Sequence, residues 1–274
     1  MDRMPAEVVD ALACPVCSAA VNVTGTTLSC ANRHSFDFAR QGYVNLLTGR
    51  AAADNADTAP MVAARADFLA AGHYAPMADM LASQTTDVGD GLIVDAGAGT
   101  GHYLSRVLDA APSAFGLALD LSALALRRAA RAHDRLGAVV CDVWRGWPVR
   151  DGVAAAVLNV FAPRNGGEFR RVLRPGGVLL VVTPGPDHLA ELGTAAGLLS
   201  VDPEKDRRLA AALPGFALRE RQVLQVPLRL SPLDVWRVVH MGPAGHHRTD
   251  PAPEPGGEPT EATASFVISA YRPE

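Results

Sequence analysis

The sequence predicts an α/β fold built on a doubly wound, mostly parallel sheet, preceded by a small metal-binding module. Three observations predict this architecture. Residues 92–96 are an unbroken apolar run that leads into glycine at every second position, which suits a strand buried on both faces followed by a tight turn. Apolar runs and helix-like segments then alternate as far as residue 183. Three cysteines and a histidine cluster before residue 35, where they indicate a metal site.

The N-terminal cluster has the pattern C-x2-C-x12-C-x3-H, formed by Cys14, Cys17, Cys30 and His34. Tetrahedral zinc needs four such ligands, and two tight knuckles joined by a hairpin over 21–28 supply them. The rival interpretation, a disulfide with a spare thiol, fits badly with a chain that has no apolar signal segment. Four protein ligands leave no open position for water, so we expect a structural zinc ion. Cys141 stands alone after a strand and is expected in the core.

Composition limits the remaining possibilities. The 274 residues are 49% hydrophobic, which is enough for a large core, and the net charge of −4 creates no field that would attract nucleic acid. Any RNA contact must therefore come from local basic patches. The longest aliphatic run, 178–182, is far too short to cross a bilayer, so we expect a cytoplasmic protein without membrane contact. The expected domains are a zinc module over 1–50, a linker and helical connector over 51–85, and the α/β domain over 86–274.

The elements of the α/β domain follow in order from the apolar pattern. Helices are expected over 100–108, 123–132 and 167–173, and strands over 92–96, 114–119, 138–141, 153–159 and 178–183, with a turn at 174–177. Two further strand-like runs, 218–228 and 264–271, would complete a sheet of seven strands. The proline and glycine residues at 251–257 predict a loop.

The spacing of the glycine loop distinguishes between cofactors. The dinucleotide pattern G-x-G-x-x-G fails because His102 stands where the third glycine should be, and no phosphate-binding G-x-x-x-x-G-K-[ST] occurs. The observed D-x-G-x-G-x-G resembles the loop of class I methyltransferases that bind S-adenosylmethionine. The alternative is a glycine-rich turn with two solvated aspartates. The resemblance implies that the cofactor is bound by the loop itself, through Asp95, Gly97, Gly99, Thr100 and Gly101. It also implies that Asp120, at the end of the second strand, binds the ribose, and that Asp142, after the third strand, contacts the adenine.

Further motifs give a more specific resemblance. The zinc pattern runs into H-x-F-D-x-A-R-x-G-Y-V-N-L-L, an M-x-x-A-R helix ends in Gly72-His73-Tyr74-x-Pro76, and the chain also carries N-V-F-A-P at 159–163 and T-P-G-P-D-H-L at 183–189. Together they resemble the 23S rRNA (guanine-N1)-methyltransferases of the RlmA type, which include macrolide-resistance members of actinobacteria. The likeness weakens after Val201. It implies that Tyr74 and His188 contact the cofactor; without it, a helix-capping aromatic and a surface imidazole would be the simpler interpretations.

Methyl transfer to guanine N1 needs alignment, exclusion of water and removal of the ring proton. For these tasks the sequence offers Asn159 and Phe161 at the end of the fourth strand, and Asp57 in the connector as the base. Each also has an ordinary interpretation, as a turn residue, a buried aromatic or a solvated acid.

For 23S rRNA, the expected partner, the sequence offers the basic residues Arg33, Arg40 and Arg50 around the zinc module. A second group, Arg127, Arg128, Arg131 and Arg135, is expected to be a solvated helix face. Two other functions stay open: a methyltransferase for a small molecule, and a non-catalytic RNA-binding protein. The target nucleotide, drug resistance and the choice between monomer and homodimer stay open as well.

Overall fold

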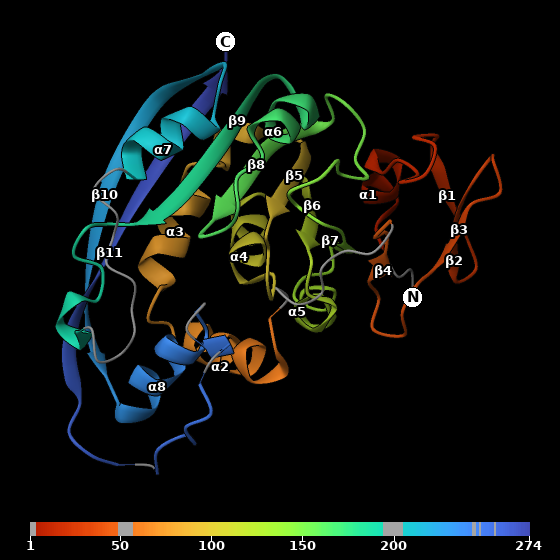
Figure 1. Ribbon diagram of the computed structural model, residues 1–274. Helices are drawn as coiled ribbons and strands as arrows, with labels where there is room; N and C mark the ends of the chain where they lie inside the picture. The colour runs from red at the N-terminus through yellow and green to blue at the C-terminus, as the bar shows by residue number, and fades with distance from the viewer. Residues whose placement is uncertain (1–3, 49–56, 194–204, 243–244, 247, 255) are drawn as a thin grey trace.

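The computed structural model describes residues 4–48, 57–193, 205–242, 245–246, 248–254 and 256–274 (Figure 1). Its main sheet has eight strands in the order β10-β11-β9-β8-β5-β6-β7-β4, one more than the seven expected, because β4 of the N-terminal segment joins the edge. The strands from β9 through to β4 pair in parallel, whereas β11 pairs antiparallel with both β9 and β10. The strands are β4 (Val44–Asn45), β5 (Gly91–Ala96), β6 (Ala114–Asp120), β7 (Leu136–Val140), β8 (Ala154–Val160), β9 (Leu173–Pro184), β10 (Phe216–Leu230) and β11 (Thr260–Pro273).

Helices cover both faces of this sheet, as a doubly wound fold requires (Figure 1). Residues of α2, α3, α4, α5 and α8 contribute to the buried cluster on one face, and those of α1, α6 and α7 to the cluster on the other. The helices are α1 (Ala6–Ala11), α2 (Ala59–Ala70), α3 (Ala75–Ser83), α4 (His102–Ala110), α5 (Ala123–Ala129), α6 (Gly166–Val172), α7 (Lys205–Ala212) and α8 (Pro232–His240), with 3-10 turns η2 (Thr86–Val88) and η3 (Ala190–Leu192).

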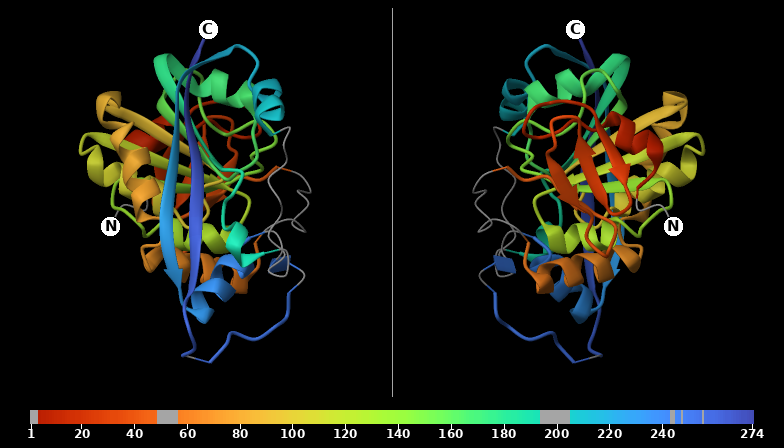
Figure 2. Two further views of the ribbon diagram at one scale, coloured as in Figure 1. Left: turned by 90° about the vertical axis from the view of Figure 1, so that its left-hand side faces the viewer. Right: turned by 90° about the vertical axis from the view of Figure 1, so that its right-hand side faces the viewer.

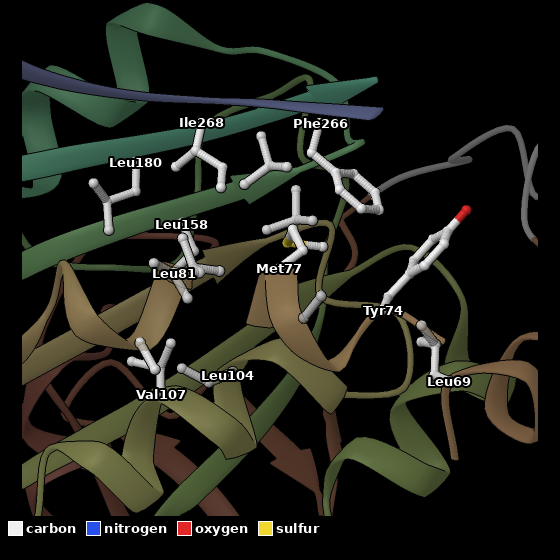
Figure 3. Packing of buried hydrophobic residues seen from close by; sticks show 14 of the residues in the cluster. Leu69, Tyr74, Met77, Leu81, Leu104, Val107, Leu158, Leu180, Phe266 and Ile268 are labelled. Atoms are coloured by element: carbon white, nitrogen blue, oxygen red, sulfur yellow. The ribbon is translucent and has the colours of Figure 1, made fainter. Parts of the chain in front are cut away.

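The central strands send alternate side chains into the two clusters, which explains why their sequences are apolar without a break. In β5, Ile93 belongs to one cluster while Leu92 and Val94 belong to the other. Figure 3 shows the first cluster, where side chains of β8, β9 and β11 face Met77 and Leu81 of α3 and the residues of α4 below them. The sheet therefore has no solvated face along β5, and binding must occur at its edge or at the ends of its strands.

Most predicted elements are confirmed, but several bounds differ and the helices α1, α7 and α8 were not predicted. Helix α5 ends at Ala129, before the predicted end at residue 132. The predicted turn at 174–177 lies inside β9, where the register shifts between its pairs with β8. Helix α8 was missed, although Ser231 caps it by accepting a hydrogen bond from the Asp234 N–H at 3.1 Å, a pattern readable from Ser-Pro-Leu-Asp. Within the described ranges, no helix has both the length and the apolar character needed to cross a membrane.

The N-terminal module is joined to the main sheet rather than tethered beside it. Its own sheet contains β1 (Val21–Thr24), β2 (Thr27–Cys30) and β3 (Ser35–Asp37), seen in front in the right-hand view of Figure 2. Strand β4 then pairs with β7, and the Leu46 N–H donates to the Val140 carbonyl at 3.0 Å. Residues of the module and of β5, β6 and β7 share one buried cluster. The boundaries at 50 and 85 stay a prediction, but the module and the α/β domain pack as neighbours.

Candidate functional site

The four predicted zinc ligands meet in the N-terminal module. Their ligating atoms all lie within 4.8 Å of one another, with the His34 Nδ1 at 3.5 Å from the sulfurs of both Cys14 and Cys30. The Cys17 and Cys30 sulfurs are 3.7 Å apart. Ligands bound to tetrahedral zinc at about 2.0–2.3 Å lie roughly 3.3–3.8 Å from one another, so the cluster fits the ion with little adjustment.

The surroundings of this cluster favour a thiolate at one position. A hydrogen bond from the Ala19 backbone, supported by the side chain of Asn32, lowers the pKa of Cys17 to about 6. Burial raises the pKa of Cys14, which a bound cation would offset. With three cysteines and one histidine as ligands, the site is closed, and zinc there would stabilise the fold of the module.

A cavity of about 520 Å³ lies at the carboxyl ends of the parallel strands, where the order reverses on either side of β5. Its size is that of a small-molecule site. Nine of the predicted cofactor and catalytic residues line it: Asp57, Tyr74, Gly97, Gly99, Thr100, Asp120, Asp142, Phe161 and His188. Asp95, Gly101 and Asn159 do not, and each has a supporting position described below.

All three loop glycines adopt positive φ angles, +83° at Gly97, +54° at Gly99 and +77° at Gly101. A Cβ at Gly97 would lie 2.4 Å from the Cβ of Ala162, and one at Gly101 would lie 3.0 Å from Ala129. At these two positions the close neighbour is therefore the protein itself, which differs from the expectation that each glycine makes room for a ligand. A Cβ at Gly99 would have only ordinary contact, with Arg65.

Asp95 ends β5 beneath this loop and is 1% exposed. Neither of its carboxylate oxygens has a hydrogen-bond partner among the described residues. Burial, together with the nearby charge of Asp120, raises the pKa of Asp95 to about 8. A buried acid without a partner is costly in a free protein, so its presence beneath the cavity fits a cationic or hydrogen-bonding group of a bound cofactor.

Asp120 occupies the predicted position at the end of β6, where its carboxylate also organises the loop. Its Oδ2 accepts a hydrogen bond from the Gly99 N–H at 2.8 Å, and its Oδ1 accepts one from the Ser122 N–H at 2.8 Å. Burial raises the pKa of Asp120. Asp142 follows β7, accepts from the Trp144 N–H at 3.0 Å and pairs with Arg145 at 3.2 Å. Two acids thus reach the cavity after neighbouring strands, where their oxygens can accept hydrogen bonds from a ligand.

Tyr74 and His188, far apart in sequence, are hydrogen-bonded at 3.1 Å in the cavity wall. The His188 Nδ1 lies 2.8 Å from the Ser265 carbonyl, so Nδ1 carries the proton and Nε2 accepts from the Tyr74 hydroxyl. Tyr74 is buried, which raises its pKa, and its ring packs on Phe266 (Figure 3). Phe161 lies 6.0 Å from Phe266, is 41% exposed and has a φ of +53°, a strained value for an aromatic residue.

Asn159 is fully buried and acts on the backbone beside the cavity. Its Nδ2 donates to the carbonyls of Ala96 at 3.3 Å and Pro163 at 2.8 Å, tying the glycine loop to the loop that carries Phe161. The Asn159 Oδ1 has no partner among the described residues. The structure therefore gives Asn159 a positioning contact and no face on the cavity.

Asp57 lines the cavity and forms an ion pair with Arg65, whose other nitrogen donates to the Met241 carbonyl at 2.6 Å. Arg65 was missed as a site residue, although it belongs to the M-x-x-A-R motif. Trp144 was also missed: it lines the cavity, is 67% exposed, and stands two positions after Asp142. The sequence could have indicated Trp144, because a large aromatic residue lies only two positions after the acid that follows a strand.

The predicted RNA-binding arginines are only partly described. Arg33 and Arg40 are exposed on the zinc module, and Arg33 has a φ of +66°. Arg50 lies outside the described residues. The expectation of one solvated arginine face on α5 is wrong for Arg135, which is half-buried and donates to the carbonyls of Leu108, Ala111 and Ala114.

Several known proteins are similar to this chain over part or nearly all of its length. Residues 12–50 match the family model for the N-terminal zinc ribbon of RlmA. A protein of Micromonospora griseorubida named as a 23S rRNA (guanine-N(1)-)-methyltransferase is 50% identical over 96% of this chain and 97% of its own. The 23S rRNA (guanine(748)-N(1))-methyltransferase of Streptomyces fradiae is 50% identical over 98% of this chain and 99% of its own.

Among solved structures, geranyl diphosphate C-methyltransferase from Streptomyces coelicolor has a TM-score of 0.47 and is 16% identical, covering 72% of this chain and 76% of that one. The relatives at 50% identity span nearly the whole chain, from the zinc module to the last strand. The chain therefore belongs to the family of 23S rRNA (guanine-N1)-methyltransferases of the RlmA type.

Proposed function

We propose that this enzyme transfers the methyl group of S-adenosylmethionine to N1 of a guanine in a hairpin loop of 23S rRNA, in the cytoplasm. The observation that carries the proposal is the cavity in which the glycine loop, the strand-end acids and the exposed Phe161 meet, in a chain that resembles such enzymes over nearly its full length. When bound, S-adenosylmethionine supplies a methyl group on a positively charged sulfur.

The residues of the chain would then align and deprotonate the acceptor. Asp120 and Asp142 would hold the nucleoside part of the cofactor, and the hydrogen-bonded Tyr74 and His188, which line the same cavity, would contact the amino acid part. The partly exposed ring of Phe161 is available to stack on a guanine drawn out of its loop.

Guanine N1 carries a proton that must leave as the methyl group arrives. Among the acids that line the cavity, Asp120 and Asp142 both accept hydrogen bonds from the backbone of their own loops, although Asp142 also pairs with Arg145, and both are assigned to the cofactor. The remaining acid, Asp57, is paired with the side chain of Arg65. A carboxylate that faces the cavity and is oriented by a guanidinium before the reaction can accept the proton of the incoming base. We assign this role to Asp57, and we assign orientation of the carboxylate to Arg65.

The test is to map modified guanines in 23S rRNA from cells with and without the gene. A methyl group on N1 blocks the Watson–Crick edge, so reverse transcription should stop at the modified base in wild-type rRNA and pass it in the deletion strain. Asp57→Asn should bind S-adenosylhomocysteine normally and fail to restore the stop. Plating the same strains on macrolides tests whether the methyl group gives resistance.

Two outcomes would contradict the proposal. If no stop depends on the gene while the purified enzyme methylates a small aromatic acceptor, the enzyme acts on a small molecule. If neither substrate is methylated although the protein binds rRNA, the chain is a non-catalytic RNA-binding protein.

A further inference from the structure

A second hollow, of about 530 Å³, lies between α2, α4 and α5. Arginines make up a third of its lining: Arg106 from α4, Arg127 and Arg128 from α5, and Arg131 just after α5. Leu69, Thr100 and His102 line both this hollow and the cofactor cavity. We call it the arginine hollow; it adjoins the site where the methyl group would be transferred.

The positive charge of the hollow is only partly neutralised. Arg106 donates to Asp79 at 2.6 Å, and Asp109, the one acid among the described residues of the lining, lies 3.6 Å from His133. Arg127, Arg128 and Arg131 are exposed, and none of them pairs with an acid in the part of the chain that the structure describes.

Two neighbouring basic residues, Arg135 and His102, add no free charge to the hollow. Arg135, in the same stretch, is held by three backbone carbonyls and does not line the hollow. Burial and the charge of Arg106 lower the pKa of His102, so its imidazole is neutral at pH 7. The described residues of the lining thus hold three unpaired guanidinium groups against the single carboxylate of Asp109, on a chain whose net charge is −4.

We propose that the arginine hollow binds backbone phosphates of the RNA substrate, next to the guanine that enters the cofactor cavity. This inference rests on the proposed function. A base that is drawn out of a folded RNA brings its flanking phosphates with it, and these must lie near the cavity mouth. Exposed guanidinium groups bind phosphate through paired N–H donors, and a hollow that shares three residues with the cavity is within reach of those phosphates.

The position of α5 connects the hollow to the zinc module. Helix α5 packs against β7, and the far edge of β7 pairs with β4, the last strand of the zinc module. In Figure 1, α5 accordingly lies at the foot of the sheet between α2 and the module. A hairpin that contacts Arg33 and Arg40 on the module would therefore pass α5 before its loop reaches the cavity.

The test compares the RNA affinities of two variants in which arginine is replaced by uncharged glutamine. Arg128→Gln/Arg131→Gln removes two charges from the hollow, and Arg219→Gln removes one exposed charge from β10 at the opposite edge of the sheet. Glutamine is a good helix former, so α5 should persist. Binding of a 23S rRNA hairpin would be measured between 50 and 200 mM salt, with the affinity for S-adenosylhomocysteine and the thermal midpoint as checks on folding.

Each lost phosphate contact should reduce the slope of log affinity against log salt by roughly 0.7–0.9, which weakens binding by roughly five- to eightfold per contact at 0.1 M salt. The double variant should therefore lose about 1.4–1.8 from its slope, and Arg219→Gln should match the wild type. If the wild type methylates rRNA while the double variant keeps the wild-type slope, the hollow proposal fails and the proposed function stands. If the wild type neither binds nor methylates rRNA, both fail.

Discussion

The protonation of Asp95 gives a prediction whose size follows from the structure. Asp95 is buried without a hydrogen-bond partner among the described residues, and its pKa is raised from 3.8 to about 8. Between these two values the folded protein holds a proton that the unfolded chain has released. The contribution of Asp95 to the free energy of unfolding must therefore fall as pH rises through this window, and that contribution is largest below pH 4.

Asp95→Asn removes this dependence because the amide is neutral in both states. Each unit of pKa is worth about 1.4 kcal/mol, and the interval from pH 5 to pH 8 covers nearly three units of the shift. The free energy of unfolding of the wild type, relative to that of Asp95→Asn, should therefore decrease by about 4 kcal/mol between pH 5 and pH 8. Asp120 is present in both proteins, so its own titration largely cancels in the comparison.

Urea unfolding of cofactor-free, zinc-loaded protein at pH 5 and pH 8, followed by circular dichroism, measures this difference. A gap between wild type and Asp95→Asn that is the same at both pH values would refute the argument, since it would mean that Asp95 is ionised or has a partner in the folded protein. A gap that widens in the opposite direction would indicate that the pKa of Asp95 is lowered by folding.

Two further predictions concern the zinc module and the loop. Cys30→Ser should abolish zinc binding and unfold the module. Although the zinc ligands are far from the glycine loop in sequence, β4 pairs with β7, which leads to Asp142, so we also expect weaker binding of S-adenosylhomocysteine. An unchanged affinity in calorimetry would show that the two sites are uncoupled. Asp120→Ala removes the acceptor of the Gly99 and Ser122 N–H groups. A lost charge-assisted hydrogen bond costs about 1.5–3 kcal/mol, so the affinity for S-adenosylhomocysteine should fall roughly ten- to a hundredfold. An affinity equal to that of the wild type would place the cofactor elsewhere.

The sequence alone determined the features that are local in the chain. The zinc ligands could be identified because their spacing within about twenty residues is itself the geometric requirement of a tetrahedral site. The glycine loop could be identified because a strand, a tight turn and a helix follow one another without interruption, which also locates Asp120 at the end of the next parallel strand. Family membership likewise followed from motifs that are contiguous in sequence.

Only the tertiary structure decided which distant side chains meet. The contact of Arg65 with the Met241 carbonyl just after α8, and the pairing of Tyr74 with His188, depend on how helices pack over the carboxyl ends of the strands, which no periodicity encodes. Packing also separated residues of one apparent type: Arg135 is held by backbone carbonyls, whereas Arg128, seven positions earlier, faces the hollow. The reason is physical, because a side chain's role is set by the neighbours that folding brings to it, and those neighbours come from elements far away in the sequence.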